Sequence, residues 1–286
     1  MSIDIESVLN AELPSWTMSW SPDDVILYHL AIGAGDPPCE LRTLNYAFEG
    51  QLSVLPTFSS AAAQRDHRVL LDLPGMDVDR DRVLHGEQTV EVFAALPSAG
   101  EATLTSRVTE IVDKGKAAIV YLETDARTAD GTLLTVNRSS LFFPGEGGFS
   151  GGAPAASASR EPEAPEREPD VTVLRSTLPQ QALLYRLTGD KALLHVDPAV
   201  AGRMGFERPI LHGLCTFGLT CMTAVDQLLA GDVQRIASFG GRFAAPVFPG
   251  ETLEIAIWKD EPDVRLRVRS RDRGIDVLKH GHLRVA

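Results

Sequence analysis

The chain reads Gly205-Phe206-Glu207-Arg208-Pro209-Ile210-Leu211-His212-Gly213-Leu214-Cys215-Thr216-Phe217-Gly218 at the start of a helical pattern that runs from residue 213 to about residue 229. Three runs rich in Val, Ile and Leu follow this pattern, at residues 253–258, 264–268 and 275–285. Such runs, separated by turn residues, are typical of antiparallel strands. The second half of the chain therefore predicts a long helix followed by an antiparallel sheet.

The first half repeats this order. Ser21-Pro22-Asp23-Asp24 is typical of a helix start and predicts a helix to about residue 32. Strand-like runs follow at residues 89–93, 102–112, 118–124 and 133–143. Gly100-Glu101-Ala102-Thr103-Leu104 resembles Gly250-Glu251-Thr252-Leu253, and each enters a predicted sheet after a proline. We therefore expect an α+β protein built from two similar modules, joined face to face or edge to edge.

A change in composition separates the two halves. Residues 145–152 read Gly-Glu-Gly-Gly-Phe-Ser-Gly-Gly, and Ala, Ser, Pro, Glu and Arg dominate the residues that follow. Such a segment cannot pack a core and is typical of a linker. We expect an N-terminal module at residues 1–143, a linker at residues 144–170 and a C-terminal module at residues 171–286.

Composition excludes several classes of protein. The chain has 286 residues and a formal net charge of −12, which argues against nucleic-acid binding because phosphates require a basic surface. No apolar run approaches the ~18 residues that span a bilayer, and the N-terminus lacks a secretory pattern. We expect a cytoplasmic protein without a membrane or nucleic-acid partner. The three cysteines have no metal-ligand spacing and suggest no disulfide framework.

The residues before the long helix suggest acid–base chemistry. Asp190 precedes His195 by five residues in Gly189-Asp190-Lys191-Ala192-Leu193-Leu194-His195. A carboxylate and an imidazole in one small volume can move protons between water and carbon. The amide of Gly213, at the helix start, could stabilise negative charge on a carbonyl oxygen by roughly 3 kcal/mol. Spacing alone leaves the structural alternatives open: a helix cap for Asp190, a structural histidine at 195 and a close-packing glycine at 213.

Metal sites have little support. His280-Gly281-His282 places two imidazoles on one strand without a third ligand nearby in the sequence, which favours a solvated edge. No nucleophile elbow, phosphate loop or zinc spacing occurs elsewhere. We expect no metal site.

Residues 185–218 resemble the hydratase 2 signature of (R)-specific 2-enoyl-CoA hydratases, the MaoC-like dehydratases, which include the hydratase domain of peroxisomal multifunctional enzyme type 2 and actinobacterial relatives. Further motifs similar to the family occur along the chain, and they are Phe48-Glu49-Gly50, Leu55-Pro56-Thr57-Phe58, Leu84-His85-Gly86-Glu87-Gln88, Asp113-Lys114-Gly115, Gly147-Gly148-Phe149 and Pro246-Val247-Phe248-Pro249-Gly250-Glu251-Thr252-Leu253. The resemblance implies a double hot-dog fold, in which each module is a long helix wrapped by an antiparallel sheet. It also implies a homodimer that needs no cofactor.

The resemblance assigns roles to individual residues. It implies that Asp190 and His195 activate water and that the Gly213 N–H holds the thioester oxygen of an acyl-CoA substrate. The positions similar to the family's substrate contacts are His85, Gly86, Lys114, Phe243 and Glu49. The implied reaction is the reversible hydration of trans-2-enoyl-CoA to (3R)-3-hydroxyacyl-CoA, in fatty acid or steroid side-chain metabolism.

One departure keeps alternatives open. The family usually reads Gly-Asp-x-Asn-Pro-x-His, whereas Ala192 and Leu193 replace the asparagine and the proline here. Losing a buried amide contact costs about 1–3 kcal/mol, so turnover could be slowed. The protein could instead be a catalytically impaired acyl-CoA-binding or partner subunit, or hydrolyse thioesters on the same scaffold. The small residues Ala61, Ala62 and Ala63 are compatible with a wide acyl cavity in the first half.

Overall fold

The computed structural model describes residues 3–38, 40–151, 163–260 and 263–286. Cys39 and the middle of the predicted linker lie outside these ranges. The strands of the described residues are β1 (Trp16–Trp20), β2 (Leu84–Val92), β3 (Gly100–Asp113), β4 (Ala117–Arg127), β5 (Leu133–Pro144), β6 (Val171–Ser176), β7 (Ile236–Phe243), β8 (Thr252–Asp260), β9 (Asp263–Ser270) and β10 (Ile275–Val285). They form one ten-stranded sheet in the order β1-β3-β4-β5-β2-β7-β10-β9-β8-β6.

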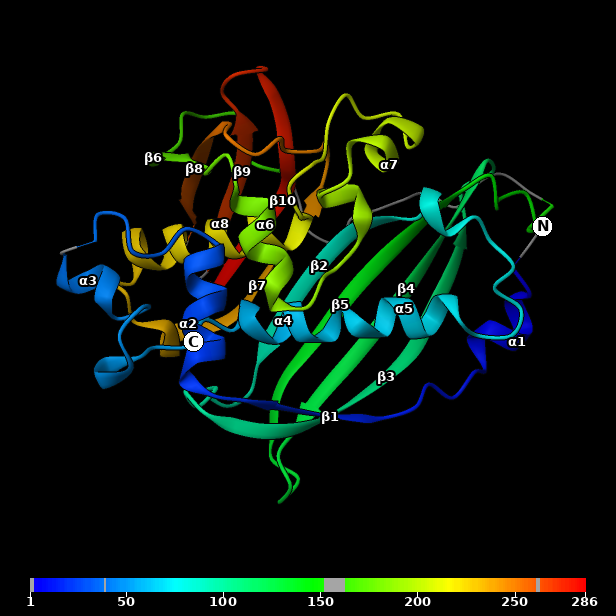
Figure 1. The fold of residues 1–286 in the computed structure, drawn as a ribbon, viewed down its shortest axis with the longest axis horizontal. Coiled ribbons are helices and arrows are strands. Elements are labelled where there is room, and N and C mark those ends of the chain that lie inside the picture. The colour runs from blue at the N-terminus through cyan, green and yellow to red at the C-terminus, as the bar shows by residue number, and fades with distance from the viewer. Residues whose placement is uncertain (1–2, 39, 152–162, 261–262) are drawn as a thin grey trace.

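The two halves of the chain meet edge to edge in this sheet (Figure 1). Strands β1 to β5 come from the first half, and β6 to β10 come from the second. Their shared boundary is the antiparallel pairing of β2 with β7, which places Val90 opposite Phe239 and Glu87 opposite Arg242. We call this pairing the seam. The α+β class is confirmed, and the exact limits of the modules and linker stay a prediction.

Helices lie along one face of the sheet (Figure 1). The α-helices of the described residues are α1 (Ile5–Leu9), α2 (Pro22–Ala31), α3 (Leu41–Leu44), α4 (Thr57–Ala63), α5 (Arg65–Leu71), α6 (Gln181–Tyr185), α7 (Pro198–Arg203) and α8 (Gly213–Leu228). The 3₁₀ turns are η1 (Glu49–Gln51), η2 (Arg80–Arg82), η3 (Arg186–Thr188), η4 (Leu193–His195) and η5 (Val233–Arg235). Among these residues, no helix combines the length and apolar character needed to cross a bilayer.

Helix α2 begins as the sequence predicts. The Ser21 hydroxyl accepts from the N–H of Asp24, and the Asp24 carboxylate accepts from the N–H of Ser21. This reciprocal capping satisfies two amides that a helix start leaves unpaired.

Helices α4 and α5, rather than α2, cover the first-half sheet. They run end to end across strands β4 and β5 in Figure 1. Some of the contacts are polar: Asp66 accepts from the Ser106 hydroxyl of β3 (2.6 Å), and Asn137 of β5 donates to the Ser59 hydroxyl (3.0 Å). The sequence does not predict these helices, because α4 is buried on most sides and has no polar face to set a helical period.

Helix α8 forms the centre of the second half and of the main core. Its residues 214–225 are all buried. Gly218 allows α2 to approach closely, since a Cβ there would lie 2.5 Å from the Tyr28 hydroxyl oxygen. Helices from both halves therefore share one core.

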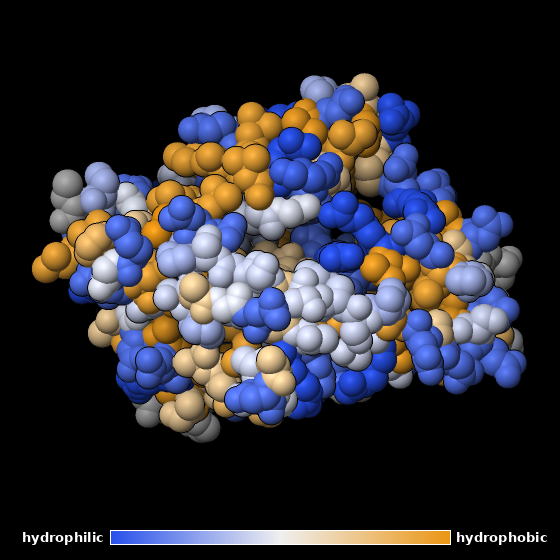
Figure 2. All heavy atoms as spheres, turned by 60° about the horizontal axis from the view of Figure 1, so that its bottom comes forward, coloured by the Kyte–Doolittle hydropathy of each residue, from blue (hydrophilic) through white to orange (hydrophobic). Residues whose placement is uncertain are grey.

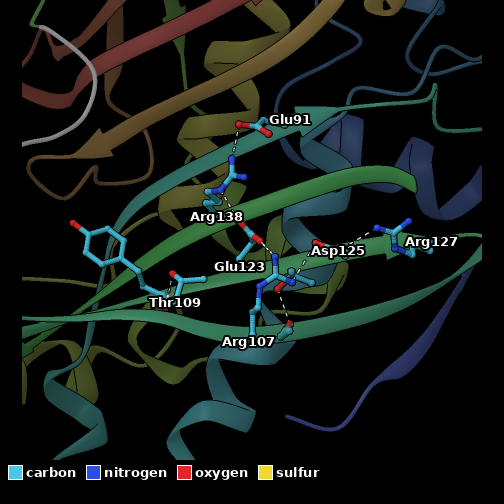
Figure 3. Close-up of polar contacts among 10 residues, drawn as sticks. Glu91, Arg107, Thr109, Glu123, Asp125, Arg127 and Arg138 are labelled. Carbon is cyan, nitrogen blue, oxygen red and sulfur yellow. Dashed lines mark hydrogen bonds and ion pairs between the residues drawn. The ribbon is translucent and has the colours of Figure 1, made fainter. Parts of the chain in front are cut away.

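The opposite face of the sheet carries charges that alternate in sign across four strands (Figure 3). These residues are Glu91, Arg138, Glu123, Arg107, Asp125 and Arg127. Glu123 sits between two arginines and accepts from Arg138 over 2.6 Å. Side chains alternate faces along a strand, so Arg107 points away from α5 because Ser106 points toward it. Each pair contributes at most about 0.2–1 kcal/mol because the arginines are half exposed.

The expectation that His280-Gly281-His282 forms a solvated edge is wrong. Strand β10 is an interior strand, and His282 is only 4% exposed. The pairing of β10 with β7 shifts register between Lys279 and His282, and His280 adopts a φ of 51° at this bulge. The two imidazoles therefore do not form a solvated edge.

A buried imidazole makes stability depend on pH. His29 lies between the carbonyl of Tyr46 (2.9 Å from Nδ1) and the N–H of Leu55 (3.3 Å from Nε2), which selects the neutral ring. Burial lowers its pKa to about 4. Protons therefore bind the unfolded chain first, and stability that is complete above pH 6.5 is lost as the pH falls toward 4. We expect the free energy of unfolding to drop by about 2 kcal/mol between pH 7 and pH 5 from this ring alone.

Urea unfolding at the two pH values measures this loss. His29→Gln is the matched variant, because it cannot titrate, and it should show a smaller drop than the native chain. An equal drop in both would contradict the assignment to His29.

Candidate active site

A cavity of about 940 Å³ lies between the two halves. Figure 2 shows a hollow in the surface, with hydrophilic residues along much of its rim and apolar residues at its lower edge. Seven of the eight predicted site residues line the cavity, and they are Asp190, His195, Gly213, His85, Gly86, Lys114 and Phe243. Glu49 does not: it is exposed on η1. Nor do Ala61, Ala62 and Ala63, which pack in or against the main core.

Asp190 is the buried acid of this cavity, with a side chain that is 8% exposed. The N–H of Ala192 donates to Oδ1 over 3.0 Å, and Nε2 of Gln64 donates to Oδ2 over 2.6 Å. Oδ2 also faces Nε2 of His195 at 3.8 Å and Nε2 of His212 at 3.9 Å. These two separations are too long for direct hydrogen bonds, and a water that lies to one side of the line joining such atoms can bridge them.

His195 ends the 3₁₀ turn η4 and presents one nitrogen to the acid. Its Nδ1 lies 2.8 Å from the carbonyl oxygen of Ile210. A carbonyl only accepts, so Nδ1 carries the proton and Nε2 of the neutral ring is an acceptor. That acceptor faces Asp190. The turn thus places a carboxylate and an unprotonated nitrogen on either side of one small gap.

His212 is a third member of the cluster that the sequence does not place beside the pair. It is the N-cap of α8 and is 1% exposed. Its ring stacks on His195 with centroids 3.7 Å apart and planes 25° from parallel. This packing fixes the plane of the His195 ring. The only sequence signal is its position directly before Gly213.

Burial and neighbouring groups set the protonation states. Burial raises the pKa of Asp190, but attraction to the two imidazoles, which take up protons at low pH, and the bonds from Ala192 and Gln64 outweigh it and hold that pKa below its ordinary value. Burial lowers the pKa of His195, and lowers that of His212 to about 3. At neutral pH the centre therefore holds a carboxylate and two neutral imidazoles, which suits a general base.

Gly213 supplies the amide of the first residue of α8 to the same cavity. The first amides of a helix have no acceptor within it, and the helix dipole favours negative charge there. A Cβ at this position would lie 3.2 Å from Cε1 of Phe243. The absence of a side chain at Gly213 therefore allows the Phe243 ring to pack against the start of α8, close to this amide.

The seam brings the first-half residues to this place. His85 and Gly86 lie at a register shift in β2, where a Cβ on Gly86 would lie 2.7 Å from the Ser140 hydroxyl. The His85 ring contacts Phe243 of β7, with centroids 5.0 Å apart. Lys114 lines the cavity from the turn after β3.

The cluster does not suit a metal ion. Asp190, His195 and His212 each offer a ligand atom within 4.8 Å of the others. Among the described residues, this is the group of three or more potential ligands that lie so close together. Nε2 of His212, however, lies 3.4 Å from the carbonyl oxygen of Asp190, so this nitrogen is a hydrogen-bond donor and has no lone pair to offer a cation. The arrangement fits a bound water better than a cation.

The sequence also matches two family profiles. Residues 18–145 match the MFE-2 hydratase 2 N-terminal domain, and residues 158–278 match the MaoC like domain. Enoyl-CoA hydratase ChsH3 from Mycobacterium tuberculosis is 48% identical over 262 residues, which cover 91% of each chain.

The chain belongs to the MaoC-like hydratase 2 family. A MaoC-like dehydratase from Phytophthora capsici has a TM-score of 0.87 at 28% identity, covering 99% of this chain and 98% of that one. A conserved hypothetical protein from Mycobacterium tuberculosis, described as having a double hotdog fold, has a TM-score of 0.59 at 15% identity and covers 99% of this chain and 98% of that one. The double hot-dog prediction is thereby confirmed.

The departure from the hydratase 2 motif has a visible result. Ala192 contributes its backbone N–H to Asp190 but no side-chain donor. Leu193 is 55% exposed and lines the cavity. In the described part of the chain, the side chain that bonds the Asp190 carboxylate directly is Gln64, from the other half. No local motif marks Gln64, so its role is visible only in the folded chain.

Proposed function

We propose that this protein catalyses the reversible hydration of trans-2-enoyl-CoA to (3R)-3-hydroxyacyl-CoA. The observation that carries the proposal is the gap between Oδ2 of Asp190 and Nε2 of His195, 3.8 Å apart in a deep cavity. A water there contacts both a base and an acceptor that orients it. The Gly213 amide is the donor for the thioester oxygen.

The mechanism follows from these positions. Asp190 removes a proton from the water while the oxygen of that water bonds to C3 of the enoyl group. Negative charge moves to the thioester oxygen, where one amide donor such as Gly213 N–H contributes about 3 kcal/mol. The proton is then delivered to C2, which restores the carboxylate. The net change is one water added across the double bond.

Charge around the cavity supports a CoA ligand. Six cationic side chains line it, and they are Arg68, Arg80, Lys114, Lys191, Arg203 and Arg242. Three acids line it as well, whereas acids outnumber bases 39 to 27 in the whole chain. A local excess of cations suits the phosphates of CoA. We therefore include Lys114, His85, Gly86 and Phe243 among the substrate contacts, and leave out Glu49 because it lies outside the cavity.

The acyl group has room to be bulky. Both halves contribute apolar lining, and the volume lies near the upper end of the roughly 300–1,000 Å³ typical of ligand sites. We infer long, branched or ring-bearing acyl groups, including fatty and steroid side-chain thioesters. We further infer a cytoplasmic homodimer, and sedimentation analysis of the purified protein tests the dimer.

The purified protein should lower the enoyl-thioester absorbance of crotonyl-CoA and of a longer or branched enoyl-CoA. Products should be the (3R) epimers, identified by coupling to a stereospecific 3-hydroxyacyl-CoA dehydrogenase. Binding across chain lengths without turnover would instead favour the non-catalytic alternative. Release of free CoA, measured with a thiol reagent, would favour hydrolysis.

A further inference from the structure

Gln64 stands at the junction of α4 and α5 and reaches the base from the other half of the chain. Its Nε2–H donates to Oδ2 of Asp190 over 2.6 Å. Backbone bonds hold the junction on both sides: the Gln64 N–H donates to Ser60 (3.3 Å), and the Gln64 carbonyl accepts from His67 (3.2 Å). The carboxamide therefore projects from a rigid backbone.

A side chain of α5 holds the peptide before Asp190. Arg68 follows Gln64 by four residues, which places both on one helix face. Its Nη2 donates to the carbonyl of Gly189 over 3.1 Å. Gly189 has a φ of 131°, a conformation that favours glycine, so the chain turns sharply into residue 190. The first half thus holds both the backbone and the carboxylate of this loop.

The Gln64 bond determines which lone pair of the carboxylate meets water. Each carboxylate oxygen has about two acceptor positions. Oδ1 receives the Ala192 N–H, and Oδ2 receives the Gln64 side-chain N–H while it also lies 3.8 Å from Nε2 of His195. Ala192 has only a methyl side chain. Without Gln64, the carboxylate would lose the side-chain donor that holds Oδ2 toward the gap.

We propose that Gln64 is a positioning residue for hydration: its amide holds Oδ2 of Asp190 so that the remaining lone pair meets the water beside His195. The inference rests on the proposed function and deepens it. The acid–base centre is assembled from both halves, and the carboxamide comes from α4–α5 where residue 192 offers none.

Two substitutions test the role. Gln64→Met keeps the length and removes the donor, and should lower kcat about 10- to 100-fold with KM changed less than about 3-fold. Gln64→Glu regains a donor only when protonated. Its kcat/KM relative to Gln64→Met should therefore exceed about 5 at pH 5.5 and fall to 1 or below at pH 8. Exposed Gln51 on η1 provides the matched control, Gln51→Met, which should behave as the native chain.

The ratio separates positioning from a merely structural role, which would lower both variants by a constant factor. Gln64→Met keeps Asp190 and His195 and has no titratable group at position 64, so its own pH profile serves as the baseline for the ratio. A Gln64→Met variant within 2-fold of native kcat, or a ratio that does not change with pH, overturns the inference. If Gln64→Met fails to fold, the pH profile of Gln64→Glu alone tests the inference. Its activity should fall as the pH rises through the pKa of that glutamate, and activity that stays constant there overturns the inference. A native chain without hydration activity would refute the proposed function itself.

Discussion

Asp190→Asn is expected to reduce kcat/KM for enoyl-CoA hydration by about 10²–10⁴-fold, the range that a lost general base usually costs. Asparagine matches aspartate in shape but has no basic oxygen at neutral pH. Burial would ordinarily favour the neutral acid, yet the surrounding imidazoles and donors keep the pKa of Asp190 below its usual value, so the native side chain is charged when water is bound. Steady-state rates with crotonyl-CoA measure the loss.

Asp197→Asn is the matched control for that variant. Asp197 caps α7 by accepting from the N–H groups of Ala199 and Val200, and asparagine caps helices about as well as aspartate. Its activity and thermal unfolding should equal those of the native chain. Equal activity in Asp190→Asn and the native protein would refute the assignment of the base.

His195→Gln is expected to lower kcat/KM by about 10²–10³-fold. Glutamine can still donate to the carbonyl of Ile210, but it offers no ring nitrogen to the water beside Asp190. The His195 ring also packs against the stacked His212 ring. Glutamine is therefore a better test substitution than alanine, which would leave a void. Rates measured from pH 6 to 8 test the change.

The double variant Asp190→Asn/His195→Gln provides the internal control. When two groups act on the same water, replacing both lowers kcat/KM little more than the more damaging single substitution does. Fully additive losses would mean that the two residues act independently. Native rates in His195→Gln would exclude its role in the reaction.

Local patterns predict much of the fold. The capping residues Ser21 and Asp24 announce α2, and the apolar run from Gly213 announces α8, because each signal lies within a few neighbouring residues. The joining of the halves is different. Opposing Val90 and Phe239 are about 150 positions apart in sequence, and strand pairing of that kind leaves no local trace.

The candidate site likewise contains residues that the local sequence predicts and residues that it does not. Asp190, His195 and Gly213 lie within one short segment, and the fold brings them to one cavity as expected. Gln64 directly follows helix α4, whose buried polar residues hide its helical period, and nothing in the neighbouring sequence points to a carboxylate. Glu49 shows the converse: motif similarity suggested a site residue, but its turn leaves it exposed.

The seam has a consequence for the chain as a single polypeptide. Divided at the linker, each half would carry an unpaired inner strand, β2 or β7, with its backbone donors and acceptors open to any other strand. Produced apart, the fragments would tend to aggregate; produced together, they have a complementary edge on which to form a heterodimer. Only that reassembled pair would regain Gln64 opposite Asp190. A single polypeptide ensures that the two halves, each incomplete as an enzyme, are always made in equal numbers.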